Sequence, residues 1–89
     1  MIKTTIVLIN KLGLHARASA KFVSTASRFQ SDIDVIKNSQ TVNGKSIMGV
    51  MMLAASYGNT LTLQIDGPDE VEMEQALVDL INSRFGEAE

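Results

Sequence analysis

Seven short stretches of this chain alternate between the residue pattern of a β-strand and that of an amphipathic helix, and their order constrains the fold more than any other feature. Strands are predicted at residues 2–9, 32–37, 40–43 and 60–65. Helices are predicted at 16–28, at 47–53 and from residue 70 onward. Three helices in the order β-α-β-β-α-β-α are too few to cover both faces of a four-stranded sheet. We therefore predict an α+β fold in a single domain, residues 1–89, whose antiparallel sheet is covered on one face.

The first and last helices are each predicted from a stripe of apolar residues at helical spacing. In the first helix the stripe consists of Ala16, Ala20, Phe22, Val23, Ala26 and Phe29, and the opposite side carries Arg17, Lys21, Ser24 and Arg28. In the last helix it consists of Met73, Leu77, Leu80 and Ile81. Asp69 and Glu72 are spaced as a capping box at the start of that helix, and Gly86 follows its end.

The chain contains no cysteine and one histidine, which removes several classes of chemistry. Disulfides, thiol catalysis and thiolate metal sites need cysteine, and one histidine cannot supply the ligands of a zinc site. We predict neither a metal nor a cofactor. A serine-histidine-acid triad is weakly supported, since no nucleophile-elbow pattern accompanies the histidine. Without cysteines, and without a signal or membrane-spanning run, the chain is expected in the cytoplasm and not inserted in a membrane.

Charge is distributed unevenly along the chain. Residues 1–31 contain five basic residues and no acid, whereas residues 66–89 contain eight acids and a single base, Arg84. The net charge is -2 and aromatic residues make up 4% of the chain, so stacking platforms and a strong basic footprint are both lacking. Binding of nucleic acid is therefore the poorest functional hypothesis.

His15, the only histidine, directly precedes the predicted helix at 16–28. The simplest interpretation is a loop residue or a weak helix cap. A second follows from the helix start, whose unpaired amides and dipole suit a phosphate and disfavour the imidazolium, so that the ring lone pair can attack phosphorus. The backbone of Ala16 and Arg17 and the Arg17 guanidinium would then bind phosphate oxygens. Because no acidic machinery for hydrolysis stands nearby in the sequence, this interpretation describes a carrier more than an enzyme.

Two segments, GLHARASAKFV at 13–23 and NGKSIMGVMMLAA at 43–55, resemble the signature segments of HPr, the histidine-containing phosphocarrier family of the phosphoenolpyruvate-dependent sugar phosphotransferase system. The resemblance spans the whole chain. It implies an open-faced β-sandwich with three helices on one face of the sheet. It also implies that His15 is phosphorylated on Nδ1 by phospho-enzyme I and discharged to a IIA domain of a sugar permease, with Arg17 supporting the phosphate.

One residue of the first segment departs from the family pattern, which usually has proline where this chain has Ala18. Proline is tolerated in the first helical turn because the N–H that it lacks has no helical partner, so alanine keeps the helix and adds a donor. We expect altered rates with the function retained. The departure leaves open whether the chain serves sugar uptake or a nitrogen-branch paralogue that acts on regulatory proteins.

Ser46 precedes the predicted helix at 47–53 in the sequence NGKS. A nucleotide-binding P-loop would need glycine five residues before Gly44, where this chain has Ser39. Serine favours the N-cap position, where it stabilises a helix by about 1 kcal/mol. In the resembled family the matching serine is phosphorylated by an ATP-dependent HPr kinase/phosphorylase, which makes Ser46 a candidate regulatory site.

The apolar residues of the helix at 47–53 are too many for so short a helix to bury, and adaptable methionines suit several partners. We predict a docking patch near His15 made of Ile47, Met48, Met51, Arg17, Lys21 and Lys45. Its cationic side chains would steer a monomeric carrier toward acidic partners. A regulatory module that binds through the same surface without obligatory phosphoryl transfer is the alternative.

Overall fold

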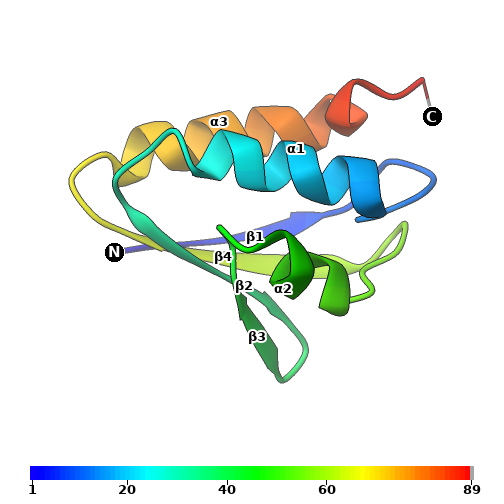
Figure 1. The fold of residues 1–89 in the computed structure, drawn as a ribbon, viewed down its shortest axis with the longest axis horizontal. Coiled ribbons are helices and arrows are strands. Elements are labelled where there is room, and N and C mark those ends of the chain that lie inside the picture. The colour runs from blue at the N-terminus through cyan, green and yellow to red at the C-terminus, as the bar shows by residue number, and fades with distance from the viewer. Residues whose placement is uncertain (89) are drawn as a thin grey trace.

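The computed structural model describes residues 1–88, which form a four-stranded sheet and a layer of helices (Figure 1). The strands are β1 (Ile2–Val7), β2 (Asp32–Lys37), β3 (Gln40–Asn43) and β4 (Thr60–Asp66). The helices are α1 (Ala16–Ala26), α2 (Ile47–Met52) and α3 (Glu70–Asn82), followed by the short 3-10 helix η1 (Arg84–Gly86). Within residues 1–88 no helix combines the length and the apolar character needed to cross a membrane. The predicted order of elements and the α+β class are confirmed.

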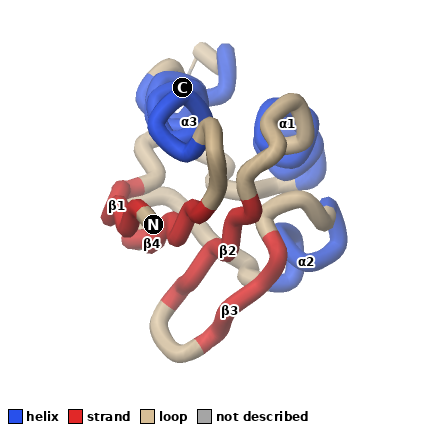
Figure 2. The backbone as a smooth tube through the Cα atoms, turned by 90° about the vertical axis from the view of Figure 1, so that its left-hand side faces the viewer, coloured by secondary structure: helices blue, strands red, loops and turns tan. Residues whose placement is uncertain are grey.

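The sheet has the strand order β1-β4-β2-β3, and every neighbouring pair is antiparallel. Val7 of β1 pairs with Thr60 of β4, and Ile33 of β2 pairs with Ile65 on the other side of β4. Figure 2 shows α1 and α3 over one face of this sheet and α2 on the same side, next to β3. No helix within residues 1–88 covers the other face, so the predicted open-faced β-sandwich is confirmed.

The core lies between β4, β2 and the helices. Leu61, Leu63 and Ile65 alternate with polar residues along β4 and are fully buried, as the sequence pattern predicts. The helices contribute Phe22, Val23 and Ala26 from α1 and Met73, Leu77 and Ile81 from α3, all of them buried. Phe85 of η1 closes the end of this core beside α1. Because these apolar stripes pack on the sheet, they also fix the orientations of α1 and α3.

Several boundaries differ from the predictions, each with a local reason. β1 ends at Val7 and not at residue 9, because Leu8 exchanges backbone hydrogen bonds with the turn before β4, accepting from Gly58 and donating to Asn59. α1 ends at Ala26 and not at residue 28, because the amides of Arg28 and Phe29 bond only three residues back, to Thr25 and Ala26. Ala16 was predicted to face inward but is exposed, and Ala18 and Ser19 are buried in its place.

The predicted capping box at α3 is not formed, although Asp69 does precede the helix. The Asp69 carboxylate instead accepts hydrogen bonds from the amides of Gln30 and Ser31, both at 2.9 Å, and from the Ser31 hydroxyl at 2.5 Å. The bond from the Ser31 hydroxyl, followed by that from the Gln30 amide, lowers the pKa of the Asp69 carboxyl. Asp69 therefore ties the loop after α1 to the start of α3.

Candidate functional site

The loop between β1 and α1 fixes where His15 stands. Gly13 adopts a left-handed conformation with φ of +62°, and a Cβ at this position would lie 2.5 Å from the carbonyl oxygen of Ala55. The next residue, Leu14, is buried and its amide donates to the same carbonyl at 2.9 Å. Asn10 closes the loop from inside, because its Nδ2 donates to the Gly13 carbonyl at 2.8 Å. The loop is thus held against the segment that follows α2.

His15 occupies the N-cap position of α1, as the sequence predicts. Its backbone is extended, with φ of -72° and ψ of 179°, and its carbonyl accepts the first helical hydrogen bond from the Ser19 amide at 2.8 Å. Its side chain makes no capping bond and remains 27% exposed. The amides of Ala16 and Arg17 belong to the first turn, where a helix offers no carbonyl partner. The imidazole therefore lies beside the start of α1 without capping it.

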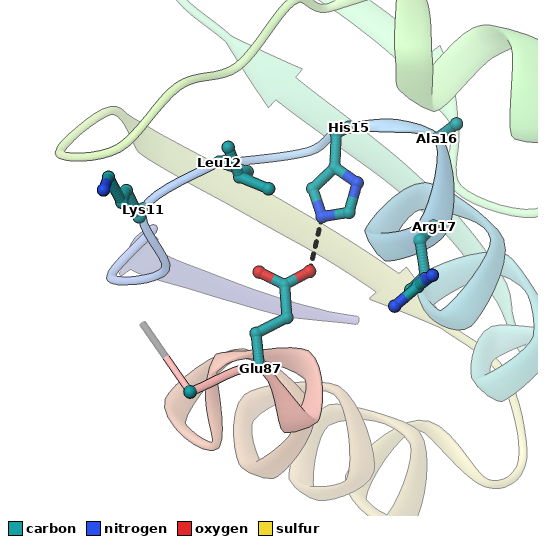
Figure 3. Close-up of a pocket in the computed structure, with 7 residues that line it drawn as sticks. Lys11, Leu12, His15, Ala16, Arg17 and Glu87 are labelled. Atoms are coloured by element: carbon teal, nitrogen blue, oxygen red, sulfur yellow. Dashed lines mark hydrogen bonds and ion pairs between the residues drawn. The ribbon is translucent and has the colours of Figure 1, made fainter.

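A pocket of about 790 Å³ opens around the ring. Its lining consists of Lys11, Leu12, His15, Ala16, Arg17, Glu87 and Ala88. Figure 3 shows the imidazole of His15 and the guanidinium of Arg17 projecting into this pocket from the loop and from the first turn of α1. Arg17 is exposed, so its fork can reach a bound anion. The three residues predicted to hold a phosphate, His15, Ala16 and Arg17, thus lie in one place.

Glu87 is part of this site, and sequence reasoning missed it. Its carboxylate is hydrogen-bonded to Nε2 of His15, across a separation of 72 residues (Figure 3). Asn10 Nδ2 donates to its other oxygen at 3.1 Å. Burial favours the neutral acid, yet the hydrogen bonds from His15 and Asn10 and the nearby charges of His15 and Lys21 outweigh it and lower the pKa of Glu87. An acidic group thus lies beside His15 in space, although none lies near it in the sequence.

Ser46 caps α2 as predicted. Its backbone is extended, and its Oγ accepts a hydrogen bond from the Gly49 amide at 3.1 Å. The residue is half-buried, and its hydroxyl is engaged with the helix. This geometry is that of an ordinary N-cap serine.

The residues of the predicted docking patch do not all lie near His15. Ile47, Met48 and Met51 are 45%, 75% and 42% exposed, and α2 packs beside α1. Lys21 lies on the exposed side of α1, where its amino group donates to the Phe85 carbonyl. Lys45 does not lie near His15, because its amino group donates at 2.8 Å to the Phe29 carbonyl beyond the other end of α1, a helix about 16 Å long.

Comparison with known proteins identifies a consistent set of relatives. The family model for the PTS HPr component phosphorylation site matches residues 2–83. The phosphocarrier protein HPr of Neisseria meningitidis serogroup B is 61% identical over 89 residues, which cover 100% of both chains. The crystal structure of HPr-C-His from Thermoanaerobacter tengcongensis superposes with a TM-score of 0.96 at 54% identity, covering 100% of both chains. A crystal structure of an HPr dimer from the same organism has a TM-score of 0.79 at 55% identity, covering 98% of this chain and 100% of that one.

Proposed function

Because this chain belongs to the HPr family of phosphotransferase-system phosphocarriers, we propose that it accepts a phosphoryl group from phospho-enzyme I on Nδ1 of His15 and passes it to IIA domains of sugar permeases. One observation supports this assignment above the others. The imidazole is partly exposed at the start of α1 and makes no capping bond, so one ring nitrogen stays available beside the first-turn amides.

The transfer needs a nucleophile, a binding site for the phosphoryl oxygens and easy discharge. Nδ1 would supply the nucleophile, and Figure 3 shows it on the side of the ring that faces Ala16. The amides of Ala16 and Arg17, together with the Arg17 guanidinium, would bind the phosphoryl oxygens. The protein is therefore a substrate of phosphotransferases and not itself an enzyme.

The decisive experiment is incubation with phosphoenolpyruvate and purified enzyme I. We expect a phosphoprotein whose label is labile in acid and stable in base, and we expect His15→Ala to abolish it while circular dichroism shows an intact fold. Absence of label, or label that survives the substitution, would refute the carrier function and leave the regulatory binding module as the alternative.

Ser46 is proposed as a site of regulatory phosphorylation by an HPr kinase/phosphorylase. The cap geometry supports this role, because a phosphate on Ser46 would meet the same helix start and add about -1.5 to -2 of charge. An ATP-dependent, acid-stable label that is lost in Ser46→Ala would support the proposal. The absence of such a label with an active kinase would refute it.

The partners follow from the same proposal. Enzyme I and IIA domains would contact a patch of Ile47, Met48, Met51, Arg17 and Lys21. We propose that the protein works in the cytoplasm as a monomer, whereas one of its solved relatives is an HPr dimer. Sedimentation or size-exclusion chromatography across a range of concentrations tests the monomer directly.

A further inference from the structure

Glu87 directly follows η1, and two hydrogen bonds hold its side chain beside His15. One carboxylate oxygen is bonded to Nε2 of His15, and the other accepts from Nδ2 of Asn10. Asn10 is fully buried and is itself fixed by its bond to the Gly13 carbonyl. The Glu87 side chain is 15% exposed, so it is part of the site wall and not a mobile surface acid.

The segment that carries Glu87 is also anchored to α1. Phe85 is buried in the core, and its carbonyl accepts a hydrogen bond from the amino group of Lys21. The positive charge of Lys21 acts on the Glu87 carboxylate as well. Burial alone would raise the pKa of Glu87, but the hydrogen bonds from His15 and Asn10, with the charges of His15 and Lys21, lower it, so the carboxylate stays ionised beside the ring.

An ionised carboxylate can only accept hydrogen bonds, which decides the state of the ring. Its bond with Nε2 requires the proton to be on Nε2, and a neutral imidazole then has its lone pair on Nδ1. Figure 3 shows Nδ1 on the opposite side from Glu87, toward the start of α1. Besides Glu87, the charged residues that line the pocket are Lys11 and Arg17, and both are cations.

We propose that Glu87 is a positioning residue for phosphoryl transfer: its carboxylate holds the proton of His15 on Nε2, keeps Nδ1 as the attacking nitrogen, and pairs with the ring once that nitrogen is phosphorylated. The inference rests on the proposed function of His15. No feature of the local sequence around His15 assigns such a role to residue 87.

The bonds and charges of the step balance without a proton transfer. The Nδ1 lone pair forms the new nitrogen–phosphorus bond, while the phosphorus bond in the donor protein breaks and its electron pair stays with the donor. Nε2 keeps its proton, so the phosphorylated ring is formally cationic and lies against the Glu87 carboxylate. When the phosphoryl group moves to an acceptor, the bonding pair returns to Nδ1 and the ring is neutral again. Glu87 thus stabilises a ring that is a good leaving group.

The test uses the fact that His15 is the only histidine, so the ring nitrogens of a ¹⁵N-labelled sample give signals from one residue. At a pH where the ring is neutral, we expect the wild-type protein to show Nε2 protonated and Nδ1 bare. In Glu87→Gln, whose amide can both donate and accept, we expect both tautomers to be populated. Phosphoryl transfer through His15 should slow about tenfold. Glu72→Gln, at an exposed position of α3, is the matched control and should change neither measurement.

Unchanged ring signals in Glu87→Gln, or unchanged transfer rates, would overturn the proposal, as would a wild-type ring protonated on Nδ1. Backbone amide spectra of both variants establish that the fold is intact. The tautomer measurement needs no partner protein, so its result stands apart from the labelling of His15. Failure of enzyme I to label the protein would refute the proposed function. A change of tautomer in Glu87→Gln would still demonstrate the contact between Glu87 and His15.

Discussion

Two helix starts in this protein are built alike in the backbone and used differently. His15 and Ser46 both precede their helices with extended backbone, and the carbonyl of each accepts the first helical hydrogen bond. The Ser46 hydroxyl caps α2 by accepting from Gly49, whereas the His15 ring makes no bond to α1 and contacts Glu87 from the far end of the chain. A helix start can therefore either satisfy its own amides or leave them for a ligand. In this molecule the Ser46 side chain does the first for α2, whereas the first-turn amides of α1 receive no side-chain cap from His15.

Asp69 at the start of α3 shows a third arrangement. Its carboxylate makes no capping bond, although aspartate is a favoured N-cap residue, because it binds the loop at Gln30 and Ser31. Of the three residues that precede α1, α2 and α3, only Ser46 uses its side chain to cap its own helix. Residue type alone thus does not decide how a helix start is used, since the surrounding contacts compete for the side chain.

The largest effect is expected at α1, where Arg17→Ala should slow phosphoryl transfer about tenfold or more, because a charge-assisted bond to a phosphoryl oxygen is lost. Arg17→Lys should restore only part of the rate, since an ammonium cannot form the guanidinium fork. Stopped-flow or quench-flow transfer assays measure both. Arg28→Ala, an exposed arginine beyond the other end of α1, is the control. Equal rates for Arg17→Ala and the parent would mean that the ligand-binding role of this helix start does not involve the arginine.

The second effect concerns Asp69. The pKa of its carboxyl is lowered below 3.8 in the folded protein, so its contribution to stability is present above the unfolded pKa and is lost as pH falls through the folded pKa. Asp69→Asn should reduce the melting temperature near neutral pH and flatten the acid limb of the stability curve. Because Asp69 accepts three hydrogen bonds and Ser46 one, the loss should exceed that of a cap variant. Thermal unfolding from neutral to acidic pH provides the measurement, and an unchanged acid limb would contradict the assignment.

The third effect is at α2. Ser46→Ala should lower the free energy of unfolding by about 1 kcal/mol, and Ser46→Asp should retain most of the cap. Denaturant unfolding of the two variants, beside Ser24→Ala on the exposed side of α1, gives the comparison. Enzyme I should still label both Ser46 variants, because Ser46 is not part of the His15 pocket. A Ser46→Ala protein as stable as the parent would show that the two helix starts differ less than their geometry indicates.

The smallest effect is expected from Ala18→Pro, which introduces the residue usual in the family. The first amide with a helical partner is that of Ser19, so proline at residue 18 removes no helical bond. We expect a gain of about 0.5 kcal/mol from the stiffer unfolded chain, with transfer rates of the same order. Ala20→Pro, two residues further on and past the first amide that has a helical partner, should be strongly destabilising. If Ala18→Pro were also destabilising, the lack of space around this fully buried side chain would outweigh the backbone effect.

The fold was largely predictable because its elements depend on local periodicity. The alternation in β4, the apolar stripe of α3 and the middle of the α1 stripe place the same residues inward in the sequence and in the structure, with Ala16 as the exception. Errors occur where a tertiary contact decides. Asp69 and Glu72 have the spacing of a capping box, yet Ser31, which is 38 residues away in the chain, takes the carboxylate. No local pattern contains that information.

The candidate site was predictable only in its local half. His15, Ala16 and Arg17 are consecutive, so the helix start was enough to group them. Glu87 lies 72 residues from His15, and nothing distinguishes it in sequence from the other acids of residues 66–89. The grouping of Lys45 with His15 failed for a similar reason, because α1 separates its amino group from the ring.

The left-handed turn at Gly13 has a consequence for how sequence variation is tolerated around the site. Every other amino acid adds a Cβ at a position where backbone atoms of Ala55 and Ser56 already stand within 3 Å. The exposed neighbours Lys11 and Leu12 face no such barrier. In a saturation library selected for phosphoryl transfer, we therefore expect residues 11 and 12 to accept many substitutions while glycine alone persists at residue 13.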